Sequence, residues 1–238
     1  MSIGRHAGNI APPRIVSPET MYNCIREYGI LPFFENRIPG CSVEEMTAPG
    51  FWFDGDEDTL GPWDWKIHCV QSGDIAYGKF LWGGKAAFAT IEWYRELMNW
   101  RRSQQKYQPD EAGRQILDYL EEHGSIGIKE VRALLGVKKS AADAAITRLQ
   151  MQCRVLTGDI SRVYRGEDLH YNGWQVSSFC TPEALFGEGG IPGPGGFPFA
   201  DDNPLETSNS PEESREALVE HFLELFPGTN RETILKML

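Results

Sequence analysis

Residues 61–66, with the sequence GPWDWK, bring together residue types that could do chemistry on a nucleobase. Two indole rings can stack a base that has left its duplex, and a carboxylate beside them can position a water molecule. In an extended segment Trp63 and Trp65 share one face, while Asp64 and Lys66 share the other. This pattern makes Asp64 the candidate catalytic residue, with Trp63 and Trp65 as the candidate base-stacking pocket.

The same tryptophans also fit a purely structural role. Six of the seven tryptophans of the chain lie within residues 52–100. Aromatic side chains bury large apolar areas, so this cluster is also what the core of an N-terminal unit requires. The sequence leaves both interpretations open, and they differ in whether Trp63 and Trp65 border a cleft or a packed interior.

A second group of candidate residues lies in residues 138–165. Ala142, Ala145, Ile146 and Leu149 form one apolar stripe at helical spacing, which leaves polar residues facing outward. Lysine and arginine can contact phosphate or guanine, and a threonine methyl can contact thymine. The candidate nucleic-acid-binding residues are Lys138, Lys139, Ser140, Thr147, Arg148, Arg162 and Arg165. Because the helix is rich in alanine, docking to a protein partner or to a second copy of the chain is the alternative.

The elements around this helix predict a winged helix-turn-helix. An amphipathic helix ends at Gly124, a second helix begins after Gly127 and ends at Gly136, and the third follows. Residues 153–160 and 171–179 alternate as strands on either side of a turn. In this order of elements, the third helix can enter a major groove while the hairpin contacts the flanking backbone.

Charge is unevenly distributed along the chain, whose net charge is −11. Residues 136–165 contain six lysines and arginines against two aspartates, whereas residues 201–224 contain eight acidic residues against one arginine. Phosphate contacts need clustered cations, so the acidic total excludes indiscriminate nucleic-acid binding, and the local basic stretch favours double-stranded DNA as the partner of the third helix and hairpin.

The remaining segments predict an α+β protein. A helix begins at Ser17-Pro18 and ends at Gly29, and a short helix begins at Ser42. Residues 75–81 and 85–90 predict strands joined at a glycine pair, followed by a helix over residues 91–102. The expected units are a flexible arm (1–16), an aromatic-rich α+β domain (17–108), a winged helix-turn-helix (109–187), a Gly/Pro-rich loop (188–210) and C-terminal helices (211–238).

Several kinds of site are excluded by spacing. The acidic run of residues 54–58 lacks the glycine position and the bidentate glutamate of a calcium loop. The histidines and five cysteines lack metal-ligand spacing, and no dinucleotide or phosphate-loop fingerprint occurs, so we expect neither a metal nor a cofactor. No apolar run is long enough to span a membrane, and residues 1–16 lack a secretion-signal pattern, which indicates a cytoplasmic protein.

Several segments together resemble the AlkZ-related winged-helix proteins, short relatives of the bacterial DNA glycosylases that unhook crosslinked or alkylated bases. They are GPWDWK, AYGKFLWGGKAAF, the arginine pair 101–102, ILDYLEEHG, ITRLQMQCRVLTGDI and GWQVSSFCTPEALFG, within residues 20–188. The resemblance implies a winged helix-turn-helix and a DNA-associated protein. It leaves three hypotheses: DNA binding without catalysis, an active glycosylase for alkylated or crosslinked bases, or a protein-interaction module.

The glycosylases that this family resembles carry a Gln-x-Gln or Gln-x-Asp pair near the N-terminus, which positions the attacking water. Gln150 and Gln152 match the letters of that pair, but they lie at the end of the third predicted helix. We therefore assign them no catalytic role, and expect one of them to point at the hairpin and the other at solvent.

Overall fold

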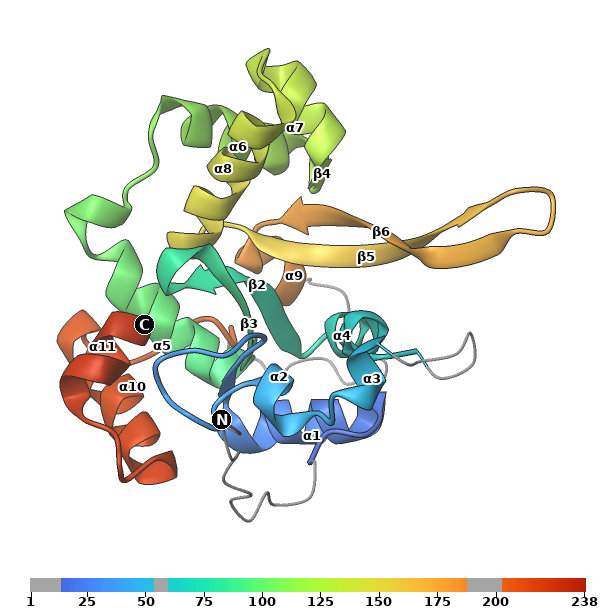
Figure 1. Ribbon diagram of the computed structural model, residues 1–238. Coiled ribbons are helices and arrows are strands. Elements are labelled where there is room, and N and C mark those ends of the chain that lie inside the picture. The colour runs from blue at the N-terminus through green and yellow to red at the C-terminus, as the bar shows by residue number, and fades with distance from the viewer. Residues whose placement is uncertain (1–13, 54–59, 188–202) are drawn as a thin grey trace, which may run out of the picture.

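The computed structural model describes residues 14–53, 60–187 and 203–238. Within these residues the chain is α+β, with eleven α-helices and two three-stranded antiparallel sheets. One sheet lies at the centre of the molecule, and the other ends in a long hairpin that projects from it (Figure 1). The acidic run of residues 54–58 and most of the expected Gly/Pro-rich loop lie outside the described residues.

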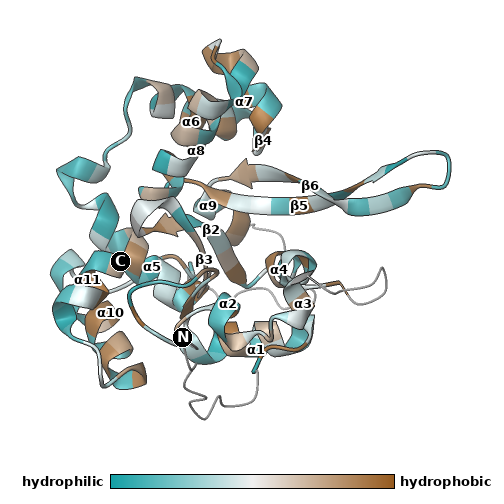
Figure 2. Ribbon diagram, in the orientation of Figure 1, coloured by the Kyte–Doolittle hydropathy of each residue, from teal (hydrophilic) through white to brown (hydrophobic). Residues whose placement is uncertain are grey.

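The central sheet has the order β1-β3-β2, so that β3 is paired on both sides. Its strands are β1 (Ile30–Pro32), β2 (Ile75–Leu81) and β3 (Lys85–Thr90). Phe88 of β3 lies opposite Leu31 and Tyr77 and is fully buried. The predicted turn is confirmed, since Gly83 and Gly84 adopt φ values of 72° and 68° that other residues avoid. Much of the strongly hydrophobic colour lies on β2 and β3 (Figure 2).

Helices surround this sheet, and the predicted helix starts are confirmed. Their bounds are α1 (Pro18–Tyr28), α2 (Val43–Met46), α3 (Gly50–Phe53), α4 (Pro62–Gln71) and α5 (Ile91–Arg102). Ser17 and Thr20 form a reciprocal capping box on α1, and the Ser42 side chain caps α2. Ile15, in the expected N-terminal arm, is fully buried and forms a parallel bridge with Thr47. Residues 14–16 are therefore held against the fold.

A three-helix unit with its own core follows α5. It contains α6 (Glu111–His123), β4 (Ile126–Gly127), α7 (Ile128–Leu135) and α8 (Lys139–Met151). Gly124 and Gly136 end α6 and α7 with positive φ, as their positions predict. The apolar stripe of α8 is buried against α6 and α7, which confirms the predicted face.

The second sheet has the order β4-β6-β5 and forms the long hairpin. Its strands β5 (Leu156–Arg165) and β6 (His170–Cys180) extend further than predicted, because the pairing continues to Arg165 and His170. The root of the hairpin lies against β2 and α4, and the tip projects beyond the body (Figure 1).

The C-terminal part returns to the central body. Its helices are α9 (Pro182–Phe186), α10 (Pro211–Leu225) and α11 (Arg231–Met237). The carboxylate of Glu96 in α5 is buried and accepts hydrogen bonds from Thr207 (2.8 Å), Asn209 (3.0 Å) and Ser214 (2.6 Å). These bonds attach the segment before α10 to α5.

Candidate functional site

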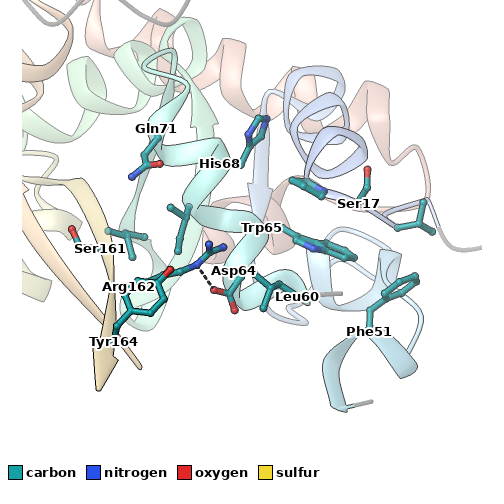
Figure 3. A pocket seen from close by; sticks show the side chains of 14 residues that line it. Ser17, Phe51, Leu60, Asp64, Trp65, His68, Gln71, Ser161, Arg162 and Tyr164 are labelled. Atoms are coloured by element: carbon teal, nitrogen blue, oxygen red, sulfur yellow. Dashed lines mark hydrogen bonds and ion pairs between the residues drawn. The ribbon is translucent and has the colours of Figure 1, made fainter. Parts of the chain in front are cut away.

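A cavity of about 660 Å³ lies where the hairpin meets α4 and the start of α1 (Figure 3). Its wall combines aromatic and aliphatic side chains with polar side chains, and both kinds come from α4 and β5. The lining residues are Val16, Ser17, Pro18, Phe51, Leu60, Asp64, Trp65, Ile67, His68, Gln71, Ile160, Ser161, Arg162 and Tyr164. We call this cavity the hairpin pocket.

Helix α4 supplies three polar residues of the wall, and its conformation corrects the sequence prediction. Residues 61–66 are not an extended segment, because Gly61 caps a helix in which Pro62 occupies the first turn. Asp64, His68 and Gln71 follow at intervals of four and three residues, so they share one face of the helix. The Gly61-Pro62 pair is the sequence signal for the start of this helix. Helical spacing from that start would have placed His68 and Gln71 beside Asp64, and both residues are missing from the sequence prediction.

The helix also separates the two tryptophans of the predicted base-stacking pocket. Residues two apart on a helix point about 200° away from each other. Trp65 is 7% exposed, lines the hairpin pocket and has its ring 5.3 Å from that of Phe51. Trp63 does not line the pocket and is 45% exposed, with its ring 5.2 Å from that of Phe33. The structure therefore brings only Trp65 to the cavity.

The opposite side of α4 carries a buried lysine. The Lys66 ammonium lies 4.8 Å from the centre of the Trp63 ring, an arrangement that favours a cation. Burial disfavours the charged form, and it lowers the pKa of Lys66 to about 8. Lys66 does not line the hairpin pocket, so this amine is not placed to act there.

Asp64 joins the pocket wall to the hairpin. A single oxygen of its carboxylate, Oδ1, accepts hydrogen bonds from Arg162 (3.1 Å), Tyr171 (2.6 Å) and Gln175 (3.2 Å). All three donors lie on the hairpin strands, and the Asp64–Arg162 pair is drawn in Figure 3. Asp64 is only 8% exposed. We call these four residues the hairpin anchor.

The anchor changes the acidity of its donors. Burial, followed by the hydrogen bond to the Asp64 carboxylate, raises the pKa of the Tyr171 hydroxyl. Burial is the largest effect on Arg162 and opposes its charge, but the hydrogen bonds and charges of Asp64 and Tyr164 together outweigh burial, and the pKa of Arg162 is raised. Arg162 and Tyr171 therefore both keep the protons that they donate to Asp64 at neutral pH. The pocket thus offers one carboxylate bound to the hairpin, together with an imidazole and an amide on the same helix face.

The predicted nucleic-acid-binding residues fall into three environments. Lys138, Lys139 and Ser140 are exposed at the start of α8. Arg148 forms an ion pair with Asp110 (3.2 Å), and the Arg165 guanidinium lies 5.7 Å from the centre of the Trp174 ring. Arg162 belongs to the hairpin anchor.

Thr147 was expected to face outward, and this expectation is wrong. It is partly buried, and its methyl group lies close to the backbone of Gly84. The reason is that the second half of α8 packs against β2 and the turn that follows it. The exposed part of α8 is therefore largest near its first turns.

Comparison with known proteins gives a clear family assignment. The family model described as "AlkZ related" matches residues 15–238. The chain belongs to the AlkZ-related family. No curated protein and no solved structure shows significant similarity to it.

The structure also corrects one expectation for this AlkZ-related chain, which concerns the pair Gln150 and Gln152. Neither side chain points at solvent, since they are 2% and 8% exposed. Gln150 accepts a hydrogen bond from the main-chain N–H of Lys79 (3.1 Å) and donates one to Thr157 (3.3 Å), while Gln152 donates to the main-chain oxygen of Gln108 (3.1 Å). Both amides connect the end of α8 to neighbouring elements.

The part of this AlkZ-related chain that the structure describes contains no group of three or more histidine, cysteine or acidic side chains arranged to hold a metal ion. All five cysteines are buried and unbonded. Among the described helices, none combines the length and the apolar character needed to cross a membrane.

Proposed function

We propose that this chain is a DNA-binding protein, related to DNA glycosylases, in which residues 109–187 act as a winged helix-turn-helix. The observation that carries the proposal is the β5-β6 hairpin, which follows three helices, pairs with β4 between α6 and α7, and leaves the start of α8 exposed. This is the order of elements in which a third helix enters a major groove and a wing contacts the backbone. The free, buried thiols support the expected cytoplasmic location.

The charges of this unit limit which residues bind phosphate. Arg148 and Arg162 are held in ion pairs with Asp110 and Asp64, so they are partly neutralised within the protein. Lys138 and Lys139 are exposed at the start of α8 and form no ion pair within the part of the chain that the structure describes. We assign the main phosphate contacts to them. A protein of net charge −11 that uses few cations should bind duplex DNA with a modest dependence on salt.

Titration of duplex DNA at several salt concentrations tests this proposal. Replacing Lys138 and Lys139 together by Ala should weaken binding and reduce the salt slope by about two, since each lost phosphate contact reduces counterion release by about one. Arg148→Ala is the matched control, because this arginine is already paired with Asp110. If the parent protein binds no duplex or single strand at low salt, the alternative role in protein interaction is favoured.

A second candidate function is base excision in the hairpin pocket. The observation that favours it is the cavity itself, whose volume exceeds that of one nucleobase and whose wall combines Trp65 with Asp64 and His68. A flipped base needs such stacking together with a group that positions water. Because Asp64 is bound to three hairpin donors, we expect the purified protein to release no free base from alkylated duplex DNA.

Release of free base would overturn that expectation, and paired variants would then locate the catalytic group. Asp64→Asn removes the negative charge and keeps one oxygen acceptor for the anchor, whereas Tyr171→Phe removes one anchor bond and leaves the carboxylate. Activity lost in Asp64→Asn and kept in Tyr171→Phe would assign catalysis to the Asp64 carboxylate. Activity lost in both variants would indicate that base release requires the hairpin to be held in position by the anchor.

A further inference from the structure

Three arginines gather where the end of α5 meets the turn between α8 and β5. Arg101 is fully buried and is used by the fold, because its guanidinium donates to the main-chain oxygens of Phe80, Met151 and Leu238. Arg102 and Arg154 lie nearer the surface and are both partly exposed. Every side-chain nitrogen of Arg102 donates to Cys153 or Glu183, whereas Arg101 and Arg154 each keep a buried Nε that has no hydrogen-bond partner among the described residues.

Arg102 has only one partner of opposite charge. Its Nε and Nη2 donate to the main-chain oxygen of Cys153 at 3.1 and 2.6 Å. Its Nη1 and Nη2 also donate to the two oxygens of the Glu183 carboxylate, the second at 3.4 Å. The Glu183 side chain is 52% exposed, so solvent weakens this ion pair. The carboxylate lies on the short helix α9, and it is the single acidic side chain that the described residues pair with Arg102.

Arg154 has fewer hydrogen-bond acceptors than Arg102. Its Nη2 makes one long contact, 3.5 Å, with the side-chain oxygen of Gln108. Its Nε is buried and has no hydrogen-bond partner among the described residues. Burial, and then the charge of Arg102, lower the pKa of Arg154. A guanidinium in this position loses hydration without gaining protein acceptors, which costs free energy.

We propose that Arg102 and Arg154 form a binding site for a phosphate group. Two neighbouring guanidinium groups offer several N–H donors, and tetrahedral phosphate oxygens accept such donors in pairs. A phosphate oxygen would accept from the partly exposed end of the Arg154 guanidinium, where Nη2 has one long contact, and would reduce the repulsion between the two cations. Glu183 then acts as a competitor, since its carboxylate occupies one side of Arg102 in the absence of phosphate. The proposal rests on these contacts and does not require the proposed DNA-binding role.

Inorganic phosphate is the direct probe, titrated by calorimetry into the full chain at constant ionic strength with chloride as the reference anion. Arg154→Gln should weaken phosphate binding about tenfold or more, the effect of losing one charge-assisted pair. Arg154→Lys keeps the charge but loses the planar fork, so it should recover only part of the affinity. Lys129→Gln, the same charge change at an exposed site on α7, should leave the affinity unchanged.

Glu183→Gln should change phosphate affinity in the opposite direction to Arg154→Gln. Removing the competing carboxylate frees Arg102, so phosphate affinity should rise by several fold. A merely structural role for Arg102 and Glu183 would lower the thermal stability of this variant and would not tighten phosphate binding. Equal phosphate affinities for the parent, Arg154→Gln and Glu183→Gln, or a parent that does not distinguish phosphate from chloride, would overturn the proposal.

An oligonucleotide titration then identifies the source of the phosphate. If the site holds a nucleic-acid backbone, Arg154→Gln should lower oligonucleotide affinity and reduce the salt slope by about one. If it holds free phosphate, the same variant should bind the oligonucleotide as the parent does. A chain that binds phosphate but no DNA would contradict the proposed function and leave this site standing.

Discussion

The two sheets of this protein are stabilised in different ways. The central sheet is held by apolar contacts, since Ala87, Phe88 and Ala89 of its middle strand are all fully buried. The projecting sheet loses such contacts along its length, and Tyr164, Trp174 and Val176 are all at least half exposed. Beyond its root, its position relative to the body depends on the polar hairpin anchor around Asp64. A protein can thus keep one sheet rigid through burial and leave another adjustable through a few directional bonds.

The largest loss of stability is expected for a substitution in the apolar core of the central sheet. Phe88→Ala removes a fully buried ring that lies 4.6 Å from the ring of Tyr77, and it should lower the free energy of unfolding by about 3–5 kcal/mol. Trp174→Ala in the hairpin is the matched aromatic control and should cost less than about 0.5 kcal/mol. Urea unfolding measures both. Similar losses for the two variants would show that the hairpin is packed more tightly than its exposure indicates.

An intermediate effect is expected at the polar anchor. Asp64→Ala leaves Arg162, Tyr171 and Gln175 without their shared acceptor, and it should lower the free energy of unfolding by roughly 1–3 kcal/mol. Tyr171→Phe removes one of the three bonds and should cost about 1 kcal/mol. Hydrogen exchange by mass spectrometry should show faster exchange in residues 161–176 than in the central sheet. Equal acceleration in both sheets would contradict a separate anchor.

The smallest expected effect is a pH dependence confined to the central body. His221 of α10 stacks on Trp93 at 3.8 Å, and its Nε2 lies 2.8 Å from the main-chain oxygen of Tyr28. Burial lowers the pKa of His221 from its ordinary value of 6.5, so the unfolded chain binds a proton more readily than the folded one.

The stability from neutral His221 is therefore fully present above about pH 6.5, and it is lost as the pH falls through the lower folded pKa. Thermal unfolding between pH 7.5 and 5 should show a small loss of stability at the acidic end that His221→Gln reduces. Hydrogen exchange should locate the change at α10 and α1 rather than at the hairpin. An unchanged pH profile in His221→Gln would assign the effect to other groups.

Much of the secondary structure could be predicted because its causes are local. Ser17, Ser42 and Ser210 accept hydrogen bonds within three residues, and Gly83 and Gly124 supply backbone angles that a turn or helix end requires. The buried stripe of α8 likewise follows from spacing within one helix. The one local error, an extended segment at residues 61–66, came from giving more weight to alternating tryptophans than to the Gly-Pro helix start.

The candidate sites depend instead on contacts between distant residues. Asp64 and Arg162 are 98 positions apart, and Arg102 and Glu183 are 81 apart, so no periodicity in the sequence could pair them. The burial of Thr147 and Gln150 likewise follows from α8 packing on β2, which is set by the shape of both surfaces. The sequence by itself determined the family, the glycine turns and the helices that have a capping signal, but not helix α4. Only the tertiary structure decided which lysine and arginine side chains remain available to a ligand. The reason is that long-range packing determines which acidic side chain or main-chain oxygen lies next to each of them.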